Sequence, residues 1–166
     1  MASEDRSELP APGWSPLTEG YWRAAHEGRL VVQRCTDCGA HRWPPAWACY
    51  RCQSQAWEWS QVTGTGTVFS YTWADVRPVL DSPLYNIAVV ELEGAEGEPV
   101  RLITQVLGVG KEDLRCDLAV EVTFEPFDDE VAVPVFRRRP TGCGPWFPFR
   151  ELTCPSSSSD VRLLPW

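Results

Sequence analysis

Two Cys-x-x-Cys pairs constrain this chain more than any other feature of its sequence. Cys35 and Cys38 form the first pair, Cys49 and Cys52 form the second, and ten residues separate the pairs. Two residues between thiolates suit a tight turn that directs both sulfurs at one point, and two such turns give the tetrahedral four-sulfur site preferred by zinc. Gly39 follows the first pair, where a residue without a Cβ can close the turn. We predict that the four cysteines bind one metal ion.

The alternatives to a zinc site are two disulfides or an iron site. The acidic N-terminus shows no apolar segment of a signal peptide, so we expect a cytoplasmic, reducing compartment that disfavours disulfides. The spacing alone also admits a rubredoxin-type iron or an iron–sulfur centre. Four thiolates fill the tetrahedron, which indicates a structural rather than a catalytic metal. His41 lies between the pairs and could replace a cysteine, but we expect a surface or capping role for it.

The three remaining cysteines give no sign of nucleophilic chemistry. Cys116, Cys143 and Cys154 share no spacing with one another or with a nearby base. A reactive cysteine needs a base or a positive environment that lowers its pKa. We therefore expect ordinary thiols, and an enzyme that uses Cys116 is a disfavoured alternative.

The N-terminal part is expected to contain a leader, a helix and the metal module. Residues 1–17 are rich in proline and charge and predict a flexible leader. Residues 18–27 predict a short helix, with Thr18 as its N-cap and Gly28 at its end. Residues 30–34 predict a strand that leads into the first cysteine pair. We assign residues 18–60 to a helix plus a rubredoxin-like zinc ribbon.

Tryptophans and prolines are concentrated around the cysteine pairs. Pro44 and Pro45, between Trp43 and Trp47, exclude a helix and predict a stiff, extended segment. These tryptophans could cover a zinc module that is too small for a core of its own. They could equally form an exposed apolar ridge that contacts a partner. The sequence leaves both interpretations open.

Residues 61–136 predict a β-barrel. Five β-favouring runs alternate with segments rich in glycine, proline and acidic residues, and no long helical pattern lies among them. The predicted strands are residues 68–73, 85–92, 100–107, 119–124 and 131–136. Closure removes sheet edges, so we predict a mainly β protein with a five-stranded OB-fold barrel. Residues 137–166 predict a tail rich in proline, glycine and serine that also carries aromatic residues.

The charge is divided unevenly and bears on the partner. The net charge of the chain is −8; residues 61–136 carry −10, whereas residues 20–60 carry +2 and residues 137–166 carry +3. A barrel that binds single-stranded nucleic acid lines its groove with Lys and Arg, so this barrel would repel a polyphosphate. We expect no nucleic-acid partner, and a single-stranded nucleic-acid-binding OB-fold protein is the alternative. No apolar stretch is long enough to span a membrane.

Several motifs together resemble one protein family. They are Tyr21-Trp22, residues 28–39, residues 42–45, the second cysteine pair, residues 64–72 and residues 85–92. In this combination, residues 18–136 resemble the bacterial and archaeal zinc-ribbon plus OB-fold family that was first filed as a domain of unknown function. The leader and the tail lie outside the resemblance.

The resemblance implies a non-catalytic partner subunit. Members of the family accompany thiolase-like enzymes, namely a thiolase, a sterol-carrier-type aldolase or an acyltransferase of lipid or steroid metabolism. It implies docking in a hetero-oligomer and help in forming or stabilising the acyl-CoA site. The zinc-ligand positions of the family fall on Cys35, Cys38, Cys49 and Cys52, and no catalytic residue can be carried over.

Acyl-CoA would be shared with the partner, and its chemistry suggests which residues meet it. Arginines pair with phosphates, and an aromatic, proline-rich surface can cover the pantetheine and acyl arm. For the phosphates we expect Arg29, Arg34 and Arg42, with Arg137, Arg138 and Arg139 as the alternative group. For contact with the partner or the acyl chain we expect Trp43, Pro44, Pro45 and Trp47.

Overall fold

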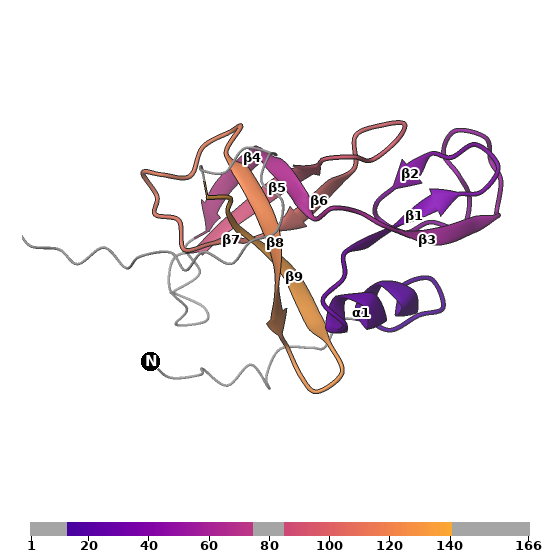
Figure 1. Ribbon diagram of the computed structural model, residues 1–166, viewed down its shortest axis with the longest axis horizontal. Helices are drawn as coiled ribbons and strands as arrows, with labels where there is room; N and C mark the ends of the chain where they lie inside the picture. Colours follow the sequence, from indigo (N-terminus) through magenta and orange to yellow (C-terminus); the bar gives the residue numbers. More distant parts are fainter. Residues whose placement is uncertain (1–12, 75–84, 141–166) are drawn as a thin grey trace, which may run out of the picture.

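The computed structural model describes residues 13–74 and 85–140, and these residues form two sheets and a short helix (Figure 1). The elements are α1 (Glu19–His26), β1 (Val31–Cys35), β2 (His41–Arg42), β3 (Trp57–Gln61), β4 (Thr65–Ala74), β5 (Tyr85–Leu92), β6 (Arg101–Thr104), β7 (Val106–Leu107), β8 (Ala119–Pro126) and β9 (Ala132–Arg138). The ribbon sheet has the order β2-β1-β3, and the barrel sheet has the order β6-β5-β4-β8-β9-β7. The predicted fold class is confirmed. Most of the predicted leader and tail lies outside the described residues.

Helix α1 begins and ends close to the predicted positions. Thr18 occupies the N-cap as predicted, although its hydroxyl makes no capping bond and instead donates to the Gly13 carbonyl at 3.1 Å. At the other end Gly28 has a φ of +73°, and the Arg29 N–H donates to the Ala24 carbonyl at 2.8 Å. A glycine in the left-handed region is the usual way to end a helix.

The barrel closes because one predicted strand is broken. Residues 100–107 were expected as a single strand, whereas the structure divides them at Gln105 into β6, which pairs with β5, and β7, which pairs in parallel with β9. The Asn86 side chain accompanies this change of partner. Its Nδ2 donates to the Val106 carbonyl and its Oδ1 accepts from the Val106 N–H, both at 2.8 Å. An asparagine therefore satisfies backbone groups that no strand reaches.

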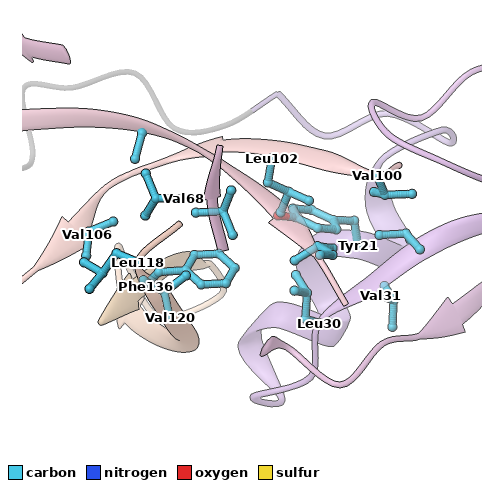
Figure 2. Close-up of a cluster of buried hydrophobic side chains, with 14 of the residues drawn as sticks. Tyr21, Leu30, Val31, Val68, Val100, Leu102, Val106, Leu118, Val120 and Phe136 are labelled. Carbon is cyan, nitrogen blue, oxygen red and sulfur yellow. The ribbon is translucent and has the colours of Figure 1, made fainter. Parts of the chain in front are cut away.

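One hydrophobic core joins the ribbon side of the molecule to the barrel (Figure 2). Tyr21 of α1 and Leu30 before β1 belong to the same buried cluster as Val68, Val120 and Phe136 of the barrel. Burial raises the pKa of the Tyr21 hydroxyl far above its usual value. The helix and the first strand thus pack in one buried cluster with the barrel.

The outer surface of the barrel also carries apolar side chains. Ile103 on β6 is 78% exposed, and Phe69 projects from an irregularity in β4. The Arg101 guanidinium lies 3.5 Å from the centre of the Phe69 ring and is paired with Glu91 at 2.9 Å. Among the described residues, no helix is long and apolar enough to cross a membrane.

Candidate metal centre and partner surface

Two similar turns hold the four cysteines. In the first, the Gly39 N–H donates to the Cys35 carbonyl at 2.9 Å; in the second, the Gln53 N–H donates to the Cys49 carbonyl at 2.9 Å. Gly39 has a φ of +76° and Gln53 a φ of +63°, so the residue after each pair takes a left-handed conformation. The role of Gly39 in closing the first turn was predicted from the sequence. The strained position at Gln53 was missed, because no residue type marks it.

The sulfurs meet as the spacing predicts. Their Sγ atoms all lie within 4.8 Å of one another, with 3.6 Å between Cys35 and Cys52 and 3.6 Å between Cys38 and Cys49. A tetrahedron with zinc–sulfur bonds of about 2.3 Å has sulfurs about 3.8 Å apart. A disulfide would need about 2 Å between sulfurs. The cluster therefore has the dimensions of a four-thiolate metal site.

The turns favour thiolates at the first cysteine of each pair. Hydrogen bonds from the Cys52 and Arg51 backbone lower the pKa of Cys49 to about 6. Those from the Cys38 and then the Asp37 backbone also lower the pKa of Cys35. The Ser54 N–H lowers the pKa of Cys52, but burial and the three neighbouring sulfurs outweigh it and raise that pKa to about 12. Four sulfurs this close cannot all carry charge without a cation between them, so the donor set fits zinc.

His41 joins the ribbon to the barrel and stays outside the sulfur cluster. Its Nδ1 accepts from the Glu96 N–H at 2.9 Å, and the backbone N–H of His41 donates to the Glu96 carbonyl at 3.0 Å. The Tyr50 hydroxyl, from between the second pair of cysteines, accepts from the Glu98 N–H at 3.1 Å. The barrel loop of residues 93–99 is thereby bonded to both sides of the metal module.

The inward position of Arg42 corrects one expectation. Arg42 is only 5% exposed; its Nε donates to the Gln33 Oε1 at 2.7 Å and its Nη2 to the Ala46 carbonyl at 2.9 Å. The Ala46 N–H also donates to the Gln33 Oε1, at 2.9 Å. Arg42 therefore shapes the loop between the cysteine pairs and is not offered to a phosphate. Gln33 was missed, although a polar residue in the apolar strand Val31–Cys35 was a signal for it.

The tryptophans divide between the two interpretations that the sequence left open. Trp43 packs against the core, with its ring centre 4.3 Å from that of Tyr21. Trp47 is 63% exposed, and Pro44, three residues before it in the chain, is also exposed. Trp43 and Pro44 are joined by a cis peptide bond. Trp43 thus serves as cover, whereas Trp47 forms an exposed apolar surface.

The other arginines that were expected to meet phosphates lie on the surface. Most already face a carboxylate: Arg29 pairs with Glu27, Arg34 with Glu58 at 3.1 Å, Arg137 with Glu121 at 2.9 Å and Arg139 with Glu93 at 3.3 Å. Within the described part of the chain, Arg138 has no such pair. Exposed pairs are weak, so a phosphate could replace the carboxylates.

Comparison with known proteins decides the family. Residues 22–58 match the ChsH2 rubredoxin-like zinc ribbon domain, and residues 59–125 match the ChsH2 C-terminal OB-fold domain. One chain of a solved structure described as the Ltp2-ChsH2(DUF35) aldolase is 32% identical, with a TM-score of 0.68 over 76% of this chain and 98% of that one. The chain belongs to the ChsH2 (DUF35) family. The resemblance seen in the sequence is confirmed.

Two further relatives extend the comparison. A protein of Thermomonospora curvata described as a probable enoyl-CoA hydratase alpha subunit is 34% identical over 130 residues, or 77% of this chain. The chain spans only 39% of the length of that relative. A DUF35 structure of unknown function from Sulfolobus solfataricus is 16% identical, with a TM-score of 0.51 over 81% of this chain and 90% of that one, and shows the fold alone.

Proposed function

We propose that this chain is a non-catalytic, zinc-binding subunit that docks on a thiolase-like enzyme and helps to form its acyl-CoA site. The observation that carries the proposal is the likeness to nearly the whole of one chain of a structure described as the Ltp2-ChsH2(DUF35) aldolase, together with the match to both ChsH2 domain families. An enoyl-CoA hydratase subunit among the relatives supports acyl-CoA as the substrate class. The role is one of binding, because four thiolates would complete the coordination of the metal and Trp47 offers an exposed aromatic surface.

The zinc ligands in this proposal are Cys35, Cys38, Cys49 and Cys52. Zinc would hold the two turns together and supply a structural cross-link, with no open position for substrate. We expect one zinc per chain by elemental analysis of the purified protein. We expect Cys49→Ser to lose the metal, whereas Cys116→Ser, at an exposed cysteine outside the cluster, keeps it. Equal zinc in both variants would contradict the assignment.

Arginines on two parts of the surface are proposed to meet the phosphates of acyl-CoA. Arg29 and Arg34 belong to the ribbon side, and Arg137, Arg138 and Arg139 form the alternative group at the end of β9. The structure favours neither group. Replacing the arginines that meet the phosphates by glutamine would raise the KM for acyl-CoA in the complex. Replacing the arginines of the other group would leave the KM unchanged.

Co-expression tests the function directly. The chain, with an affinity tag, would be produced together with a thiolase-like enzyme encoded beside it or elsewhere in the same genome. We expect a stable complex whose retro-aldol or thiolytic activity on acyl-CoA exceeds that of the enzyme alone, and no turnover by the chain alone. Full activity of every such enzyme without the chain would refute the proposal. Binding of a single-stranded oligonucleotide at low salt would favour the nucleic-acid alternative instead.

A further inference from the structure

A cavity lies at the junction of the ribbon and the barrel. Its volume is about 230 Å³, and it is lined by residues 41–43 and Tyr50 from the ribbon and by residues 98–100 from the barrel. We call this space the junction cavity. The hydrogen bonds from the barrel loop to His41 and Tyr50 fix its two walls relative to each other.

Burial distinguishes the floor of the junction cavity from its mouth. Arg42 and Val100 are almost fully buried and therefore belong to the floor. Tyr50, which is 46% exposed, and Glu98 and Pro99, which are also exposed, belong to the mouth. Trp43, half-buried, forms a wall between them. Apart from Arg42 and the buried His41, the inner lining is apolar and consists of Trp43 and Val100.

The charges at the two levels restrict the occupant. No carboxylate in the described part of the chain pairs with the Arg42 guanidinium, and its Nη1 has no hydrogen-bond partner there. A cation entering the cavity would meet this like charge at low dielectric, where repulsion is strong. An anion would have to pass the carboxylate of Glu98. A neutral group that is apolar against Trp43 and Val100 and offers an oxygen acceptor to the Arg42 Nη1 is the occupant that fits both levels.

The surface around the mouth has the composition of an interaction site. Tyr50 exposes apolar surface at the mouth, and its hydroxyl, which accepts from the Glu98 N–H, still has its own proton to donate. In the chain, the exposed Pro44 follows Trp43 of the wall, and the exposed Trp47 follows Ala46, whose carbonyl accepts from Arg42 of the floor. Glu96 and Glu98 are exposed, and neither has an ion pair in the described part of the chain. Exposed aromatic anchors beside a pocket are typical of energetically important contacts. The two carboxylates favour a partner with basic residues around its apolar anchor.

We propose that the junction cavity is the docking socket for the partner enzyme. In this inference, which rests on the proposed function, a neutral group of the enzyme, apolar apart from its oxygen acceptor, enters the cavity against Trp43 and Val100. A Lys or Arg beside it pairs with Glu98, and Trp47 packs on the surrounding surface. The contact places the enzyme across both the ribbon and the barrel.

The outer face of the barrel provides the matched comparison. Ile103 is even more exposed than Trp47, but it lies on a strand surface where Arg101 already covers the neighbouring Phe69. Glu112 is an exposed carboxylate in a different loop of the barrel, remote in sequence from the junction. Substitutions at Ile103 and Glu112 therefore reproduce the loss of apolar surface and the change of charge outside the proposed socket.

Affinity measurements with four variants test the inference. The zinc-loaded chain would be titrated with the purified thiolase-like enzyme by calorimetry, after melting temperature and zinc content show that each variant is folded. We expect Trp47→Ser and Glu98→Lys each to raise the Kd by about tenfold or more, as at an interface hot spot. We expect Ile103→Ser and Glu112→Lys to change it by less than about threefold. Glu98→Gln would also reduce the salt dependence of the Kd.

The outcomes separate the inference from the proposed function. If Trp47→Ser and Glu98→Lys bind the enzyme as tightly as the wild-type chain does, the docking socket is wrong but the proposed function stands. If only Ile103→Ser weakens binding strongly, the interface lies on the outer barrel face and the docking socket is wrong. A wild-type chain that binds no thiolase-like enzyme would overturn both.

Discussion

The buried contact between Gln33 and Arg42 gives the sharpest prediction about stability. Gln33→Leu keeps roughly the size of the side chain but removes the Oε1 that accepts from Arg42 and from the Ala46 N–H. A hydrogen bond to a charged group contributes about 1.5–3 kcal/mol, and an unpaired buried N–H costs about 1–3 kcal/mol. We therefore expect the free energy of unfolding to fall by about 2.5–6 kcal/mol, a large part of the about 5–15 kcal/mol typical of a domain.

The companion variant Arg42→Met should cost far less. It removes a buried guanidinium, and the Nη1 of that group has no hydrogen-bond partner in the described part of the chain. Gln33 still accepts from the Ala46 N–H. Replacing buried charges by apolar side chains is often close to neutral, so we expect a loss below about 2 kcal/mol. For the same reason, adding Arg42→Met to Gln33→Leu is expected to recover about 2 kcal/mol, because the unpaired cation is then gone.

Urea unfolding of the zinc-loaded protein, followed by tryptophan fluorescence, measures these differences. Glu58→Gln is the matched control, since it breaks an exposed ion pair with Arg34 in the same sheet and is expected to cost less than about 1 kcal/mol. The reasoning fails if the double variant is less stable than Gln33→Leu alone. That result would mean that Arg42 stabilises the loop without its acceptor.

Three further changes have clear expected outcomes. Asn86→Ala leaves both backbone groups of Val106 unpaired, and we expect a loss of about 2–5 kcal/mol in urea unfolding, with Asn86→Asp unable to restore the donor. Gly20→Ala would place a methyl group inside the indole of Trp59, so we expect a lower melting temperature, although alanine is the better helix former. Because folding raises the pKa of Tyr21, the stability contributed by its neutral hydroxyl is complete below about pH 10 and is lost as the pH rises further. We therefore expect the melting temperature of Tyr21→Phe to fall less steeply above about pH 10 than that of the wild type. An equally steep fall in that variant would exclude Tyr21 as the cause.

Features with a strict local requirement could be predicted from the sequence. The cysteine spacing indicated the sulfur cluster, and Gly28 indicated the end of the helix, because each depends on a few neighbouring residues. The five β-favouring runs likewise indicated a barrel. The division of the chain near residue 60 remains a prediction.

Features that depend on distant partners could not be predicted. Arg42 looked like a surface cation. Only the pairing of β1 with β2 places Gln33 opposite Arg42, whose guanidinium is then buried. Strand 100–107 looked continuous, and only the position of Phe136 on β9 shows where its pairing changes. Trp43 and Trp47 have the same local sequence character, yet one lies against Tyr21 and the other in solvent.

The shared core of Figure 2 has a consequence for how the chain can be divided. Because Tyr21 and Leu30 pack in the same buried cluster as the barrel residues, a barrel produced by itself would expose apolar surface, and we expect it not to fold without the ribbon. We therefore expect the described elements to unfold in a single cooperative transition. For a chain that loads metal as proposed, the free energy of metal binding enters that one transition. Chelation would therefore melt strands far from the sulfurs, and metal supply would control the amount of folded barrel.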